Sequence, residues 1–96
     1  MPIYHAPTED MQFVLHELLG IAQAGIPGYD ELDRETTAAI LEEAGKLAEN
    51  VLAPLNTVGD AQGCTLENGV VRTPEGFRDA YEQLRAGGWM GLDADP

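Results

Sequence analysis

The sequence predicts a small, mainly α-helical fold that also contains one β-hairpin. In three stretches the apolar residues recur at three- and four-residue spacing, which is the pattern of amphipathic helices. Between the second and third stretches, an Asn-Gly pair separates two short apolar arms, which is typical of a tight hairpin turn. A chain of 96 residues, 44% of them apolar, is long enough for one domain and apolar enough to fold.

The first predicted helix covers residues 8–19 and follows an N-terminal arm, residues 1–7. Thr8 is expected to cap its start with a side-chain oxygen, and Gly20 is expected to end it. A connector over residues 21–32 comes next, punctuated by Gly and Pro. The apolar stripe of this helix consists of Met11, Val14, Leu15, Leu18 and Leu19.

The second predicted helix, residues 34–53, is the longest. Asp33 is a good N-cap, and Pro54 marks the end. Glu42 and Lys46 have the i,i+4 spacing of a helical ion pair. At about 1.5 Å per residue the helix is roughly 30 Å long, so its stripe needs more cover than one short helix provides. The stripe consists of Ile40, Leu41, Ala44, Leu47, Ala48, Val51 and Leu52.

A loop is predicted over residues 55–63, followed by a hairpin over about residues 64–72. Asn68 and Gly69 accept the positive φ angles that a type I′ turn requires. The arms of the hairpin are short, so we expect it to be weak unless it packs on another element.

The third predicted helix, residues 74–86, has a start signal and a stop signal. Thr73 is expected to cap it, and Pro74 suits the first helical position. The adjacent glycines Gly87 and Gly88 are expected to end it. Its apolar face consists of Phe77, Ala80, Tyr81 and Leu84.

The charge balance argues against two classes of partner. The chain has 17 Asp and Glu against 5 Lys and Arg, a net charge of −12. A surface this negative repels phosphate backbones and anionic lipids, so we expect neither nucleic acid nor membrane as a partner. No secretory signal is visible in residues 1–5, and no apolar run is long enough to span a membrane. Because Cys64 is the single cysteine, an internal disulfide is impossible, and a cytoplasmic location is expected.

The histidines and the C-terminal aspartates do not indicate a metal site. His16 lies between the apolar and polar faces of the first helix, and the positions three and four residues later hold a leucine and a glycine, which are not ligands. We therefore expect His16 to be a surface or edge residue. His5 lies in the arm without an evident partner, and Asp93 and Asp95 lie near the chain end.

The remaining chemistry-bearing residues do not form a recognisable site. The carboxylate pairs Asp30-Glu31 and Glu42-Glu43 are expected to be solvated, and residues 60–67 hold too few oxygen ligands for a calcium loop. There is no glycine-rich phosphate loop and no serine, which excludes a serine nucleophile and the attachment site of acyl carrier proteins. Cys64 lacks an evident base. The sequence therefore predicts no catalytic, cofactor-binding or metal-binding residue.

Several short segments occur in a specific order along the whole chain. They are Met1-Pro2, Tyr4, Ala6-Pro7, DMQFVLHE (10–17), ILEEA (40–44), VLAPLN (51–56), GD (59–60), NGVV (68–71), TPEGF (73–77) and GGWMGL (87–92). Each segment alone is a weak signal, and the ordered set is specific. Together they resemble the N-terminal end of bacterial acyl-CoA dehydrogenases. The closest resemblance is to the long-chain subgroup with an extra N-terminal arm, which includes the 3-methylmercaptopropionyl-CoA dehydrogenases.

This resemblance implies a role for the chain. Enzymes of the family use FAD and a glutamate base to remove hydrogens from Cα and Cβ of acyl-CoA thioesters, and many are homo-oligomers. Residues 1–96 would correspond to the N-terminal helical domain, which helps to wall the acyl pocket and to support a subunit interface. No glutamate here matches the family's base, so the base and the flavin site are expected beyond residue 96, in the remaining domains. The resemblance also implies that Trp89, Met90 and Leu92 lead into further chain, unless they fold back on the helices.

Two other readings stay open from the sequence. The chain is also compatible with a stand-alone acidic interaction module that offers an apolar groove to a partner helix. An independent small enzyme is the least favoured reading, because nucleophile, metal and phosphate motifs are missing. A reading frame that continues past Pro96 would favour the dehydrogenase, and a natural stop codon there would favour the module.

Overall fold

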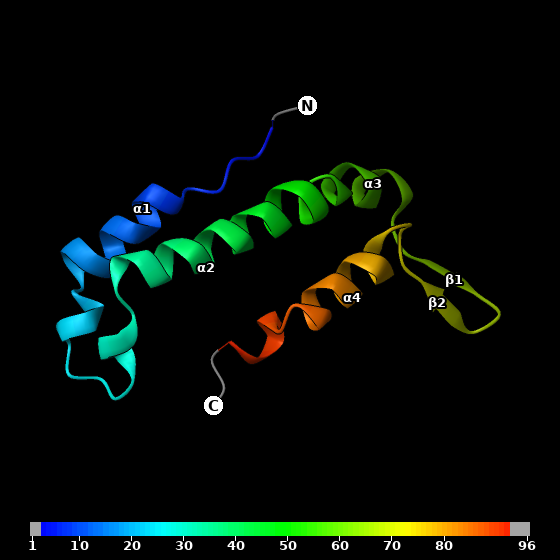
Figure 1. Cartoon of the computed structure of the whole chain (residues 1–96). Coiled ribbons are helices and arrows are strands. Elements are labelled where there is room, and N and C mark those ends of the chain that lie inside the picture. The colour runs from blue at the N-terminus through cyan, green and yellow to red at the C-terminus, as the bar shows by residue number, and fades with distance from the viewer. Residues whose placement is uncertain (1–2, 93–96) are drawn as a thin grey trace. The chain divides into compact units, whose positions relative to one another are not determined.

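The computed structural model describes residues 3–92, which form a mainly helical chain with one two-stranded antiparallel hairpin (Figure 1). The predicted fold class, mainly α with a small hairpin, is confirmed. The chain divides into two compact units, Met1–Glu49 and Asn50–Pro96, and each is described by itself. Within residues 3–92, no helix combines the length and apolar character needed to cross a membrane.

The first unit contains two helical stretches joined by a connector. The N-terminal stretch changes from α-helical to π-helical geometry halfway along, a change that sequence spacing did not signal. The connector contains two single turns of 3₁₀ helix. The elements are α1 (Thr8–Gln12), η1 (Phe13–Leu18), η2 (Ile21–Gln23), η3 (Tyr29–Glu31) and α2 (Arg34–Leu47).

Two of the three predicted helix-end signals in this unit are confirmed. The Asp33 carboxylate accepts a hydrogen bond from the backbone N–H of Thr36 at 2.8 Å, which caps α2. Gly20 has a φ of +57° directly after the helical stretch ends. The prediction that Thr8 caps α1 is wrong: Pro7 occupies the cap position, and no side chain accepts a hydrogen bond there.

The core of the first unit is small and partly polar. Its buried residues are Ile21, Thr37 and Gly45. At Gly45 the arm lies against α2 so closely that an added Cβ would stand 3.3 Å from the Cβ of Ala6. The backbone N–H of Ala6 also donates to Glu49 Oε1 at 2.6 Å, which ties the arm to the C-terminal end of this unit.

The second unit contains a short helix, the hairpin and a longer helix. The helical run that starts with α2 ends in π-helical η4 (Ala48–Leu52), before Pro54 as predicted. The Asn68-Gly69 turn is confirmed, with φ angles of +51° and +76°. The remaining elements are α3 (Leu55–Gln62), β1 (Thr65–Glu67), β2 (Val70–Arg72), α4 (Phe77–Ala86) and a 3₁₀ turn, η5 (Trp89–Gly91).

Two predictions for this unit are wrong. Residues 55–63, which contain Gly59 and Gly63, were expected to form a loop, yet α3 occupies residues 55–62 and Gly63 is its C-cap. Thr73 was expected to cap a helix from residue 74, yet α4 begins at Phe77, after Gly76 at a φ of +89°. The chain turns at this glycine instead, and the backbone N–H of Glu75 is bound by the side chain of Gln62 at 2.8 Å. The predicted stop is confirmed, because α4 ends at Ala86 and Gly87 is its C-cap.

Glycines bring α3 and α4 together in the second unit. A Cβ added to Gly59 would stand 2.9 Å from Cζ of Phe77, and one added to Gly76 would stand 2.9 Å from Cδ2 of Leu55. Gly59 therefore explains both the missed helix and its packing: it lowers helix propensity, and it admits the Phe77 ring. Ala80 is buried beside this contact region, at 4% exposure.

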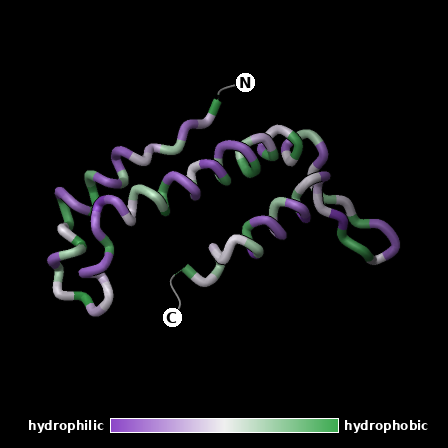
Figure 2. Tube along the Cα trace, viewed as in Figure 1, coloured by the Kyte–Doolittle hydropathy of each residue, from purple (hydrophilic) through white to green (hydrophobic). Residues whose placement is uncertain are grey.

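Large apolar side chains remain exposed in each unit. Figure 2 shows hydrophobic positions recurring along the helices and the hairpin. Trp89 is half-buried with its indole against Gly87, the C-cap of α4, whereas Met90 and Leu92 stay exposed. Side chains at least half exposed are Ile3, Phe13, Leu18, Leu19, Leu66, Val70, Val71, Tyr81, Met90 and Leu92.

Candidate functional site

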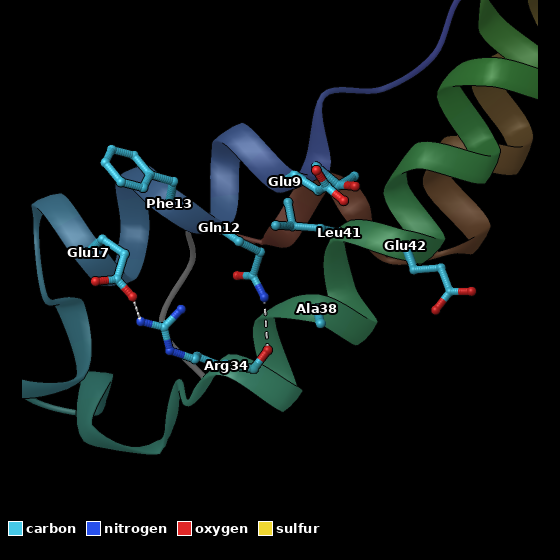
Figure 3. A pocket seen from close by; sticks show the side chains of 9 residues that line it. Glu9, Gln12, Phe13, Glu17, Arg34, Ala38, Leu41 and Glu42 are labelled. Carbon is cyan, nitrogen blue, oxygen red and sulfur yellow. Dashed lines mark hydrogen bonds and ion pairs between the residues drawn. The ribbon is translucent and has the colours of Figure 1, made fainter.

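One hollow of the first unit lies between α1–η1 and α2 (Figure 3). It is an open groove of about 530 Å³ whose apolar surface comes from Phe13, Ala38 and Leu41. Phe13 is 57% exposed although it lines the groove, so the described part of the chain does not cover this side chain. The full lining consists of Thr8, Glu9, Gln12, Phe13, Glu17, Arg34, Ala38, Leu41 and Glu42.

The charges around this α1–α2 groove are mainly negative. Glu9, Glu17 and Glu42 are exposed carboxylates at its rim. Arg34 is the one cation among the lining residues, and its guanidinium forms an ion pair with Glu17 across the groove (Figure 3). Arg34 is therefore already occupied, and the groove as a whole favours a cationic partner.

A partly buried polar network joins the two walls of the groove. The Thr37 hydroxyl, on α2, is 2.6 Å from Gln12 Oε1 and 2.7 Å from His16 Nε2. Gln12 Nε2 in turn donates to the backbone carbonyl of Arg34 at 2.9 Å (Figure 3). Since Thr37 has one proton and Gln12 Oε1 is an acceptor, Thr37 donates to Gln12 and His16 Nε2–H donates to Thr37.

His16 therefore has a structural partner that the sequence did not reveal. It is half-buried at the junction of η1 and α2, as an edge residue, and its ring is held by Thr37. Thr37 lies 21 residues away, and a threonine inside a helix gives no local signal for such a contact. The other sequence candidates are not brought together: His5, the Asp30-Glu31 pair and Cys64 are each exposed.

Two ionisable groups in this unit have shifted pKa values. The backbone N–H of Thr36, together with its hydroxyl, lowers the pKa of the Asp33 carboxyl below its ordinary value. The pKa of Lys46 is raised by its hydrogen bond to Glu43, 3.1 Å away, and by the charges of Glu43 and Glu42. The predicted Glu42–Lys46 pair is present at 3.9 Å. The contacts that cause both shifts lie within α2 and its N-cap, where they stabilise the helix. Neither shift points to acid–base chemistry.

Ligands for a metal or a phosphate are not assembled in the first unit. Among residues 3–92, no three His, Cys, Asp or Glu side chains lie close enough to hold a metal ion; Asp93 and Asp95 lie outside the described residues. The α1–α2 groove does not fit a dinucleotide phosphate, because its rim is acidic and its arginine is paired with Glu17.

Comparison with known proteins finds a similarity between the chain and part of a dehydrogenase. No protein-family model matches the chain. Over 90 residues, or 93% of its length, the chain is 39% identical to the 3-methylmercaptopropionyl-CoA dehydrogenase of Ruegeria pomeroyi. The chain spans only 15% of the length of that relative. It is thus similar to a small part of an acyl-CoA dehydrogenase, in agreement with the resemblance in its ordered segments.

Proposed function

We propose that this chain is the N-terminal α-helical domain of an FAD-dependent acyl-CoA dehydrogenase. The observation that carries the proposal is the 39% identity over 93% of the chain with part of a protein of that name. The parent enzyme would remove hydrogens from Cα and Cβ of an acyl-CoA thioester, as in fatty-acid oxidation. FAD would bind to the parent, and no residue of this chain is assigned to hold it.

Within the parent, we assign this chain a structural role. The exposed apolar side chains and the open α1–α2 groove support this role, because surfaces of this kind mark contacts with other protein. The remaining domains of the parent would cover these surfaces, and the acyl-CoA substrate would bind with the parent. We further propose that the parent is a cytoplasmic homo-oligomer. Nucleic acid and membrane stay unfavoured as partners because of the net charge of −12.

A stand-alone interaction module is the second candidate. It is favoured by the α1–α2 groove itself, since an apolar floor with an acidic rim suits a basic amphipathic helix. The two candidates differ in what the chain does without a partner enzyme. A module would bind its target as it is, whereas a dehydrogenase domain would act only when it is joined to the rest of the enzyme.

A chimera tests the proposed function directly. This chain would replace the matching segment of the Ruegeria pomeroyi dehydrogenase, and the control would carry a scrambled version of the same 96 residues. We expect the chimera to retain flavin and to oxidise 3-methylmercaptopropionyl-CoA, and the control to lose both properties. A folded chimera that holds no flavin and has no activity would refute the proposal.

The chain by itself should give the opposite result. We expect it to bind no FAD, to show no dehydrogenase activity, and to self-associate through its exposed apolar side chains. A yellow preparation of the chain alone would contradict the structural role. Monomeric sedimentation at high concentration would count against the self-association.

A further inference from the structure

A second hollow lies in the second unit, between β2 and the first turns of α4. Its volume is about 640 Å³. Val71 and Tyr81 form part of its surface and are 65% and 53% exposed. Arg72 and Arg78 also line it, one from the strand and one from the helix. We call this the β2–α4 hollow; its remaining lining residues are Val70, Thr73 and Phe77.

The two arginines of this hollow differ from the other cations of the chain. Arg34, Lys46 and Arg85 each form an ion pair with a glutamate. Arg72 and Arg78 form none with any residue in 3–92, although the chain carries 17 acidic residues. The unpaired positive charge of the described chain is therefore concentrated in one apolar hollow. This arrangement is complementary to a ligand that has carboxylates next to apolar groups.

The hairpin also leaves one edge of β2 unpaired, on the side away from β1. In a hairpin with a two-residue turn, the residues next to the turn, Glu67 and Val70, are the hydrogen-bonded pair. The next pair, Leu66 and Val71, is then the non-hydrogen-bonded one, and the N–H and C=O of Val71 point away from β1. An extended polypeptide lying beside β2 can bond to these groups.

We propose that the β2–α4 hollow binds an extended polypeptide segment that alternates carboxylates with apolar side chains. Carboxylates of the segment pair with Arg72 and Arg78, its apolar side chains cover Val71 and Tyr81, and its backbone bonds to Val71. A polypeptide is favoured over a small anion because the hollow is open and apolar. Long-range repulsion from a chain of net charge −12 opposes any anion, so binding depends on these local contacts. The inference is independent of the proposed function.

The test uses the full 96-residue chain and a short, labelled peptide that alternates Glu with Val, followed by fluorescence anisotropy. We expect saturable binding that is lost when Gln replaces Glu in the peptide. The double variant Arg72→Gln/Arg78→Gln should bind about tenfold or more weakly, because it removes two charge-assisted contacts. The control Lys46→Gln/Arg85→Gln changes the net charge by the same amount outside the hollow and should bind within about twofold of the original chain.

The apolar part of the proposal has its own pair of variants. Tyr81→Ser should weaken binding by about tenfold, as expected for an aromatic contact at an interface, and Tyr29→Ser, in the first unit, should not. Circular dichroism confirms that each variant is folded. The proposal is overturned if the peptide shows no saturable binding, or if the two double variants weaken it equally. It is also overturned if inorganic phosphate or a nucleotide displaces the peptide at low concentration, which would identify a phosphate site.

Discussion

Side-chain hydrogen bonds join the helices of the first unit, residues 1–49, whereas in the second unit, residues 50–96, glycines admit apolar side chains between α3 and α4. The charges differ too. The first unit has ten acidic residues against two basic ones, and the second has seven against three. In each unit few residues are buried. Two small units with similar exposure therefore depend on different interactions, and each should be vulnerable to a different kind of substitution.

Gly76→Ala should produce the largest effect, and only in the second unit. A φ of +89° is unfavourable for alanine, and its Cβ would stand 2.9 Å from the Leu55 side chain. We expect a loss of about 2 kcal/mol of unfolding free energy. Hydrogen exchange should accelerate in α3 and α4 and stay unchanged in α1 and α2. Equal acceleration in all four helices would show that the units are not independent.

Thr37→Val should have the next largest effect, in the first unit. The substitution keeps the shape of the side chain and removes the hydroxyl that binds Gln12 and His16. The expected loss is about 1 kcal/mol, because the groups left unpaired are only partly buried and water can reach some of them. Thr37→Ser, which keeps the hydroxyl, is the control. If valine and serine variants melt at the same temperature by circular dichroism, the network does not hold α1 to α2.

Gly59→Ala should have a small net effect. The new Cβ would meet the Phe77 ring at 2.9 Å, but that ring is 37% exposed and has room to shift. Alanine also raises helix propensity by about 1 kcal/mol, which offsets the crowding. Combined with Phe77→Leu, the same substitution should become stabilising. Thermal melts of the two single variants and the double variant measure the coupling, and simple additivity would mean that the ring is not in contact with Gly59.

The pH dependence of the Asp33 cap should be the smallest effect. Because folding lowers the pKa of this carboxyl, its contribution is complete above the unfolded value of roughly 3.9 and is lost as the pH falls through the lower folded pKa. Asp33→Asn keeps a capping side chain and cannot titrate. The difference in melting temperature between the two proteins should be constant near neutral pH and change below about pH 4. A constant difference down to pH 2 would contradict the shifted pKa.

The sequence predicted local features and missed those that depend on tertiary contacts. The Asp33 cap and the Asn68-Gly69 turn are encoded by neighbouring residues, and both are present. The helix α3 was missed because the low helix propensity of Gly59 is outweighed by its contact with Phe77. The Thr37 network was missed because it joins residues more than twenty positions apart.

The same limit applies to the candidate sites. The apolar stripes were visible in the sequence, but the spacing did not show which side chains would line a hollow: Phe13 and Ala38 line the acidic groove although neither belongs to a predicted stripe. Arg72 and Arg78 attract no notice in the sequence, because their lack of an ion pair with residues 3–92 becomes visible only when the carboxylates of that range are placed.

The central claim is that the rest of a dehydrogenase covers the exposed apolar surfaces of this chain. Amide hydrogen exchange, compared between the chain alone and the same residues in the chimera, tests this claim most directly. We expect exchange in η1, beside the α1–α2 groove, to slow by about tenfold or more in the chimera, since burial against a partner suppresses local opening. Unchanged exchange in an active chimera would mean that these surfaces stay open, and it would contradict the claim.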